Sequence, residues 1–252
     1  MDATTNYDRC LEYINSQVQT PRELTPENAV PRWRAVTISR QAGAGSHVVA
    51  EELIALLQGR APAGSPPWTI FDRNLVERVL KDHDLPARLA KFMPEDRMSN
   101  MSDTLDDLFG LHPSTWTLVR KTADTILHLA ELGNVVIIGR GANIITKNLD
   151  SAFHVRLVGS EAKRIEHLRA YKHLSLEAAS LYLRDEDLGR KRYVKKYYAA
   201  DIDDPLLYHV VINTDLLPYG EAARTIAEAV RDRSKPGSMT ANGSRPLASS
   251  AG

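Results

Sequence analysis

The chain has 252 residues, and its 32 Lys and Arg side chains balance 32 Asp and Glu side chains, so the formal net charge is zero. This balance excludes a strongly basic protein that binds polyanions over its whole surface, and the single cysteine, Cys10, excludes an internal disulfide and a cysteine-based zinc site. No apolar stretch is as long as a membrane span, and the first residues lack the basic-then-apolar order of a signal peptide, so we expect a cytoplasmic protein that does not bind membranes.

The two ends of the chain are predicted to lie outside the main domain. Residues 1–33 are polar with scattered apolar positions and several prolines, which is typical of a helical extension and a connector. Residues 34–232 are predicted to form one domain. Residues 233–252 are rich in Ser, Gly, Pro and Ala and are predicted to be a disordered tail. Within the domain, residues 82–112 carry charges, methionines and two prolines and are predicted to be an insertion of short helices.

Elsewhere in the domain, β-branched and aromatic runs alternate with amphipathic segments. Strands are predicted at residues 34–39, 68–71, 135–138, 153–158 and 208–212. Helices are predicted at residues 47–57, 73–81, 114–132, 160–171, 175–198 and 219–230, with a short one after Gly139-Arg140-Gly141. This alternation predicts an α/β fold in which a five-stranded parallel sheet carries helices on both faces.

The stretch from Val36 to Leu57 holds the strongest functional signal. A strand, a turn of small residues and a helix follow one another, and the backbone N–H groups of such a turn can hold a phosphate at the positive end of the helix. A Walker A motif, Gly-x-x-x-x-Gly-Lys-Ser/Thr, fails at three positions, where Arg40, Ser46 and His47 stand. Arg40 could supply the missing positive charge, and a plain strand-to-helix turn is the alternative.

Polar and charged residues follow four of the predicted strands, as Ser39-Arg40, Asp72-Arg73, Gly139-Arg140 and Asn213-Thr214. Because ligands of parallel sheets bind at the carboxyl ends of the strands, these residues predict a site along that edge. Arginine can bind phosphate with two hydrogen bonds, which makes Arg140 a candidate phosphate ligand. Two alternatives stay open: Asp72 can cap the following helix instead, and Arg140 can pair with a nearby carboxylate.

The predicted helix over residues 175–198 is rich in basic and aromatic side chains. Three interpretations are open: a lid that contacts phosphates, a solvated helix face, or a basic aromatic surface for nucleic acid. The neutral charge of the whole chain and the short length of the cluster argue against the third interpretation, so we do not expect nucleic acid binding. The residues concerned are Arg190, Lys191, Arg192, Tyr193, Lys195, Lys196, Tyr197 and Tyr198.

Between about Val36 and Val230 the chain resembles the cytidylate-kinase-like family of P-loop nucleoside monophosphate kinases. The resemblance rests on an ordered set of motifs: Ile-Ser-Arg-Gln-Ala-Gly-Ala-Gly, Phe-Asp-Arg-Asn-Leu, Val-Val-Ile-Ile-Gly-Arg-Gly-Ala-Asn, Arg-Asp-Glu-Asp-Leu-Gly-Arg-Lys-Arg and Tyr-His-Val-Val-Ile-Asn-Thr. It implies the three-layer P-loop NTPase fold, with residues 82–132 as a helical insertion on the acceptor side and residues 175–200 as a helical lid.

The resemblance also implies transfer of a phosphoryl group from ATP, with Mg²⁺, to a nucleoside monophosphate such as CMP or to another small acceptor. It assigns no protein residue to a metal and leaves the oligomeric state open. The alternative is a nucleotide-binding or regulatory protein that lost catalysis with the Walker lysine. By this resemblance the donor phosphates bind to Gly43, Ala44, Gly45, Ser46 and His47. The acceptor binds to Asp72, Arg73, Arg140 and Asp185. The charges that stabilise the transfer come from Arg40, Arg140, Arg184, Arg190 and Arg192.

Overall fold

The computed structural model describes Glu12, Tyr13, Ser16 and residues 33–59, 61, 65–74, 76 and 117–231. Most of the predicted N-terminal extension, the predicted insertion at 82–112 and the predicted tail at 233–252 therefore lie outside the described residues. The same holds for most of the helix predicted at 73–81 and for the start of the helix predicted at 114–132.

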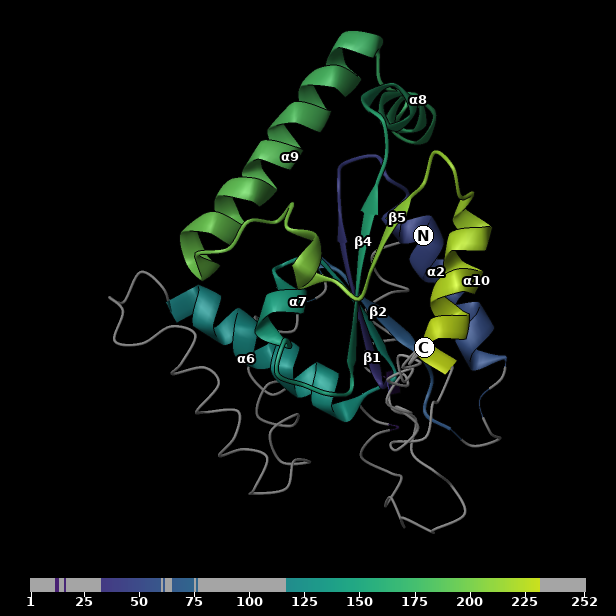
Figure 1. The fold of residues 1–252 in the computed structure, drawn as a ribbon, viewed down its shortest axis with the longest axis vertical. Helices are drawn as coiled ribbons and strands as arrows, with labels where there is room; N and C mark the ends of the chain where they lie inside the picture. Colours follow the sequence, from purple (N-terminus) through teal and green to yellow (C-terminus); the bar gives the residue numbers. More distant parts are fainter. Residues whose placement is uncertain are drawn as a thin grey trace, which may run out of the picture.

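A parallel sheet forms the centre of the molecule, as predicted (Figure 1). Its strands are β1 (Ala35–Arg40), β2 (Thr69–Phe71), β3 (Val135–Ile138), β4 (Ala152–Val158) and β5 (Val210–Asn213). Their spatial order is β2-β3-β1-β4-β5, and every neighbouring pair is parallel. Strand β1 is the central strand, and its last residue, Arg40, stands at the carboxyl edge beside Leu157 of β4.

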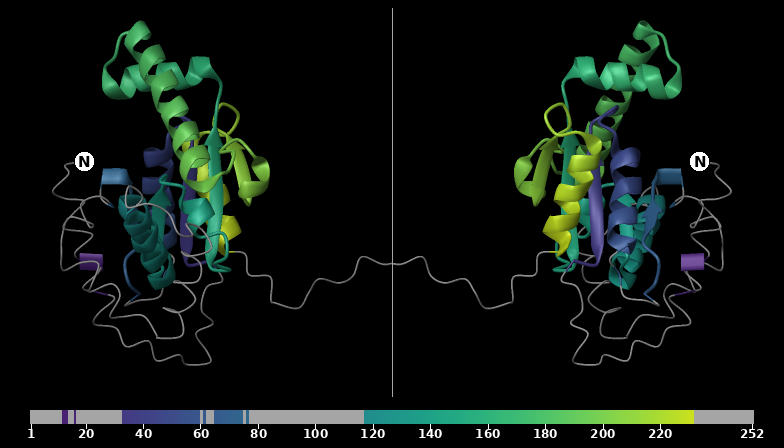
Figure 2. Two further views of the ribbon diagram at one scale, coloured as in Figure 1. Left: turned by 90° about the vertical axis from the view of Figure 1, so that its left-hand side faces the viewer. Right: turned by 90° about the vertical axis from the view of Figure 1, so that its right-hand side faces the viewer.

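Helices cover both faces of the sheet, which gives the predicted three layers (Figure 2). On one face the buried residues of α2 (Ser46–Gln58) and α10 (Tyr219–Arg231) pack against Val36 and Ile38 of β1. On the other face α6 (Thr117–Leu132), α7 (Ala142–Ile145) and the end of α9 (Leu176–Tyr198) pack against Ala35 and Ile137. Each buried Val or Ile side chain contributes about 1.5–3 kcal/mol to this core.

Helix α8 (Glu161–Lys172) and the first half of α9 form a hairpin that extends past the carboxyl edge of the sheet (Figure 1). Each helix begins at a serine whose hydroxyl accepts a backbone N–H: Ser160 accepts from Lys163 at 3.4 Å, and Ser175 accepts from Ala178 at 3.2 Å. A small apolar cluster, which includes Ala42, holds the hairpin against the β1–α2 loop. A 3₁₀ turn, η2 (Pro205–Leu207), leads from α9 to β5. Among the described residues, no helix is long and apolar enough to cross a membrane.

A buried histidine makes the stability of this fold dependent on pH. His154 of β4 is 6 % exposed, and its Nδ1 lies 2.9 Å from the Thr37 hydroxyl of β1. Burial, with a smaller effect from His209, lowers the pKa of His154 to about 4 from its ordinary value of 6.5. The unfolded chain therefore binds a proton at this residue before the folded chain does. Stability is unaffected above pH 6.5 and is lost progressively as the pH falls from 6.5 to 4, by about 3 kcal/mol in total.

We expect His154→Asn, which keeps a polar partner for Thr37, to flatten the decline of unfolding free energy between pH 7 and pH 5 in urea titrations. The matched control is His173→Asn, because His173 is exposed and caps α8 in the left-handed conformation that asparagine tolerates. An equal pH slope in wild type and His154→Asn would show that this histidine titrates normally.

Candidate active site

Two glycines of the β1–α2 loop adopt a left-handed backbone conformation. Gly43 and Gly45 have positive φ values of 79° and 76°, which glycine adopts without strain. Gly45 is the N-cap of α2, no side chain caps this helix, and its first turn holds no acidic residue. The N-terminal amides of a 13-residue helix therefore present their partial positive charge at the loop.

The two glycines are also required by packing, which the sequence does not indicate. A Cβ atom on Gly43 would lie 2.5 Å from the backbone oxygen of Arg164 in α8, and one on Gly45 would overlap the ring of Tyr219 in α10. The Gly43 carbonyl lies 2.9 Å from Nδ1 of His167, so this histidine donates from Nδ1. The loop is thus enclosed by α8 on one side and α10 on the other.

A carboxylate of the chain itself binds this loop. The Ala42 N–H donates to Oδ1 of Asp187 in α9 at 2.6 Å, and Arg164 donates to the other oxygen at 2.6 Å and to the Ala42 carbonyl at 3.1 Å. The two carboxylate oxygens of Asp187 are together engaged by Ala42, Arg164 and Arg190. A carboxylate thus takes one of the loop amides that could otherwise hold an anion.

Two adjoining cavities open at the carboxyl ends of β1 and β3. The first, which we call the loop cavity, measures about 330 Å³ and includes Gly43, Gly45, Ser46 and His47 in its wall. The second, which we call the arginine cavity, measures about 310 Å³ and lies over the β3–α7 turn. The residues common to both walls are Arg40, Arg73, Glu186 and Arg190.

Arg40 lies at the boundary between the two cavities. Its guanidinium packs against Gly139 at the end of β3, so closely that a Cβ atom there would overlap it. Burial lowers the pKa of Arg40 to about 10, and the charge of Arg190 adds to this effect while Glu186 and Asp72 oppose it. Arg40 therefore stays protonated at neutral pH. Its side chain lines both the arginine cavity and the loop cavity.

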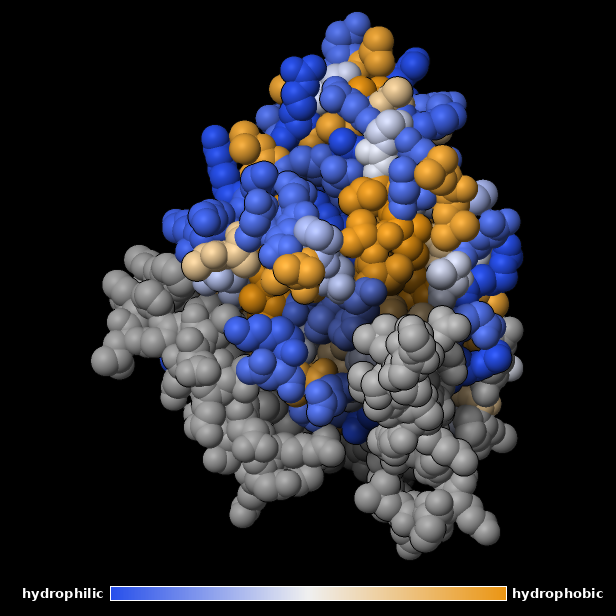
Figure 3. All heavy atoms as spheres, in the orientation of Figure 1, coloured by the Kyte–Doolittle hydropathy of each residue, from blue (hydrophilic) through white to orange (hydrophobic). Residues whose placement is uncertain are grey.

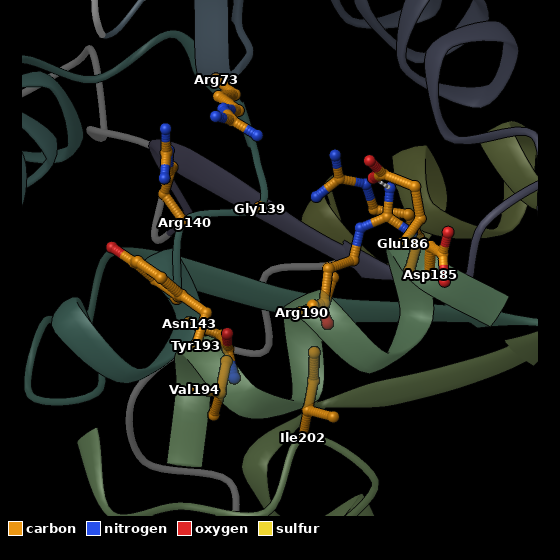
Figure 4. Close-up of a pocket in the computed structure, with 14 residues that line it drawn as sticks. Arg73, Gly139, Arg140, Asn143, Asp185, Glu186, Arg190, Tyr193, Val194 and Ile202 are labelled. Carbon is orange, nitrogen blue, oxygen red and sulfur yellow. Dashed lines mark hydrogen bonds and ion pairs between the residues drawn. The ribbon is translucent and has the colours of Figure 1, made fainter. Parts of the chain in front are cut away.

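The β3–α7 turn presents Arg140 to the arginine cavity (Figure 4). Arg140 has a φ of 56°, and its carbonyl accepts a hydrogen bond from Tyr198 at 3.3 Å. Its guanidinium lies 5.6 Å from the centre of the Tyr193 ring. Arg73 stands near Arg140 in the same wall. Asn143 of α7 has a buried amide nitrogen without a hydrogen-bond partner among the described residues.

The other predicted site residues divide between the cavities and the surface. Asp185 lines the arginine cavity, and Asp72 lines the loop cavity instead. Arg190 lines both cavities, and its guanidinium pairs with Glu186 at 2.6 Å and with Asp187 at 3.3 Å. Arg184 lines a third cavity of about 370 Å³, whereas Arg192 is exposed and lines none of the three.

The surface of α9 is largely hydrophilic (Figure 3). Its basic charge is partly neutralised by the chain itself, because Lys191 pairs with Asp203 at 3.0 Å in addition to the pairs of Arg190. Thr214, at the fourth polar strand end, hydrogen-bonds the Val158 carbonyl and lines none of the three cavities. Three of the four strand ends therefore meet at the cavities, and β5, at the edge of the sheet, does not join them.

Sequence reasoning missed a buried ion pair beneath the third cavity. Arg156 of β4 is 4 % exposed, donates to the Ser39 hydroxyl at 2.9 Å and pairs with Asp203 at 2.6 Å. Partial burial alone would raise the pKa of Asp203, but the hydrogen bond from Lys191 and the charge of Arg156 hold it below its ordinary value. The sequence did contain one indication of this buried ion pair, because an arginine stands between Val155 and Leu157 in an apolar strand.

We expect Asp203→Ala to lower the free energy of unfolding by about 2 kcal/mol, because it leaves the buried Arg156 charge without its partner. Asp203 is itself half-exposed, which reduces the effect. Glu166→Ala is the control, since Glu166 pairs with Lys163 on the surface, and we expect a change of at most about 0.5 kcal/mol. Equal losses for the two variants in urea unfolding would contradict this assignment.

The described residues hold no group of three or more His, Cys, Asp or Glu side chains that could bind a metal ion. The loop does fit a phosphate group, because the first turn of α2 carries no capping side chain and no acidic residue. The neighbouring His47 imidazole adds no positive charge at neutral pH. Burial lowers its pKa below the ordinary value, and Arg40 and Lys172 lower it further against the effect of Asp72.

Most of the chain matches a known protein family in sequence. Residues 35–216 match the sequence model of the cytidylate kinase-like family. A cytidylate kinase of Pyrococcus horikoshii is 26% identical over 165 residues, which cover 65% of this chain and 81% of that protein. A cytidylate kinase of Thermoplasma acidophilum is 25% identical over 103 residues, covering 40% of this chain and 55% of that protein.

Among solved structures, that of an uncharacterized protein from Eubacterium ventriosum superposes with a TM-score of 0.55 at 18% identity, covering 79% of this chain and 99% of that one. This likeness concerns the fold alone. The family match spans the sheet, the β1–α2 loop, the β3–α7 turn and all of α9. The chain therefore belongs to the cytidylate kinase-like family.

Proposed function

We propose that the protein transfers the terminal phosphoryl group of ATP to a nucleoside monophosphate such as CMP. The observation that carries this proposal is the pair of adjoining cavities, one at the uncapped N-terminus of α2 and one lined by Arg140, with Arg40 between them. Phosphoryl transfer requires alignment of two phosphates and stabilisation of their charge more than covalent chemistry. Two neighbouring anion sites that share arginines meet this requirement.

In this proposal the loop cavity takes the donor and the arginine cavity takes the acceptor. Gly43, Ala44, Gly45, Ser46 and His47 hold the donor phosphates through their backbone amides. Arg140, Arg73 and Asp185 hold the acceptor, and Asp72, from the wall of the loop cavity, stands beside the site of transfer. Mg²⁺ accompanies ATP and neutralises part of the phosphate charge when bound.

The arginines have separate roles in the transfer. Arg40, held at the boundary of the cavities, contacts the phosphoryl group as it passes from donor to acceptor. Arg190 reaches the same place from α9 once its contact with Glu186 is exchanged for one with phosphate. Arg184 and Arg192 line neither the loop cavity nor the arginine cavity and are candidates only for contacts at the outer edge of the site.

A second candidate function has one observation in its favour. Asp187 occupies the Ala42 amide, and Ser46 stands where the Walker lysine is expected, so a protein that binds nucleotide without transferring phosphate is the alternative. Loss of a charge contact that stabilises the transition state costs about 100- to 1000-fold in rate.

Two measurements distinguish the catalytic from the non-catalytic function: a coupled assay of ADP release with CMP, UMP or dCMP as acceptor, and calorimetry of ATP binding. We expect ADP release that depends on the acceptor. ATP binding without turnover on any acceptor would select the non-catalytic function, and absence of both would refute nucleotide binding.

A further inference from the structure

The wall of the loop cavity includes a positively charged side chain that the sequence motifs did not indicate. The helix that follows the loop begins with Ser46 and His47, so α2 supplies no ammonium group. The cavity is nevertheless bordered by basic side chains from four other segments of the chain. They are Arg40, Arg73, His167, Lys172 and Arg190.

Several of these side chains are already engaged within the protein. Arg190 pairs with Glu186 and Asp187, and the His167 ring donates to the Gly43 carbonyl. Arg40 is packed against Gly139 between the two cavities. For Lys172, the structure gives no ion pair with any carboxylate of residues 33–59, 65–74 or 117–231. Its charge is therefore available to a ligand.

The position of Lys172 suits a phosphate in the loop cavity. It is the last residue of α8, and its Nζ lies 5.2 Å from the centre of the Tyr182 ring and 5.9 Å from that of Tyr171. Two aromatic faces at these distances attract an ammonium and restrict where it points. All three residues line the loop cavity. The charge of Lys172 is also felt by His47 at the start of α2, where it helps to lower the pKa of that imidazole.

We propose that Lys172 supplies the ammonium group that contacts the terminal phosphates of a nucleoside triphosphate in the loop cavity, in place of the lysine that the loop lacks. This inference rests on the proposed function. In the transfer, the bond between the terminal phosphorus and its bridging oxygen breaks, a bond to an acceptor phosphate oxygen forms, and ADP leaves. Lys172 keeps its proton throughout and balances the charge of the transferring group.

Calorimetric titration with Mg·ATP, Mg·ADP and AMP tests the proposal on wild type, Lys172→Gln, Lys172→Arg and the control Lys163→Gln. Lys163 lies in the first turn of the same helix and is exposed at the surface. We expect Lys172→Gln to weaken ATP binding by about 10- to 100-fold, to weaken ADP binding less, and to leave AMP binding within about twofold. Lys172→Arg should restore most of the ATP affinity, and Lys163→Gln should match wild type.

The outcomes separate this inference from the proposed function. If wild type binds ATP and Lys172→Gln binds it equally well, Lys172 is not the ammonium source, while the proposed function stands. If Lys172→Gln weakens ATP, ADP and AMP by one common factor, or Lys172→Arg is as weak as Lys172→Gln, the contact is structural and the inference fails. If wild type binds no nucleotide, both proposals fail. Since the Lys172 side chain is exposed, we expect all variants to unfold at the wild-type temperature.

Discussion

Replacement of Arg140 by alanine should lower kcat/KM for the acceptor by about 1000-fold, with a smaller change in the KM for ATP. Arg140 lines the arginine cavity and lies apart from the β1–α2 loop, so its loss removes charge from the acceptor side only. A guanidinium that binds phosphate through two hydrogen bonds in a partly desolvated site contributes about 3–4 kcal/mol to the transition state. Steady-state kinetics with CMP varied at saturating ATP measures the effect.

Two further variants show whether the effect belongs to this guanidinium. Arg140→Lys keeps the charge but not the paired hydrogen bonds, and it should recover only part of the activity. Arg192→Ala removes an exposed arginine that lines none of the cavities, and it should stay within about twofold of wild type. Wild-type kinetics for Arg140→Ala would place the acceptor elsewhere, and a loss in Arg192→Ala would make Arg192 the α9 arginine that reaches phosphate.

Gly43→Ala should lower the free energy of unfolding by about 2–5 kcal/mol. The new Cβ would lie 2.5 Å from the Arg164 carbonyl oxygen, in a backbone with φ of 79°. The left-handed conformation costs a residue with a Cβ about 1–2 kcal/mol, and forced displacement of packed backbone adds about 1–3 kcal/mol. Urea unfolding followed by circular dichroism gives the value.

Gly189→Ala is the matched control, because a Cβ at Gly189 would meet nothing within 4 Å. Gly189 lies inside α9, where alanine is the better helix former, so this variant should gain about 1 kcal/mol. Gly43→Ala with wild-type stability would mean that the loop and α8 move apart at little cost. That result would also remove the packing reason for a glycine at this position.

The fold was predictable because its signals are local. Unbroken apolar runs such as 135–138 are typical of strands covered on both faces, and Ser160 and Ser175 mark the helix starts that the structure has. The rule that ligands bind at the carboxyl ends of strands then brings Arg40, Arg73 and Arg140 to one edge.

The partners of the site were not predictable, because they come from segments far apart in the sequence. Asp187 meets Ala42 across 145 residues, and Arg156 meets Ser39 across 117. The contact of the Arg40 guanidinium with Gly139 depends on how β1 and β3 pair. Lys172 lines the loop cavity only because the α8–α9 hairpin lies beside it, and no pattern in the sequence predicts the orientation of that hairpin.

Helix α9 connects the two cavities mechanically. One uninterrupted helix carries Asp187, which holds the loop, and Tyr198, which supports the Arg140 turn about 16 Å further along its axis. Because α9 is one continuous helix, a displacement of the whole helix along its axis would shift the Asp187 contact with the loop and the Tyr198 contact with the Arg140 turn together.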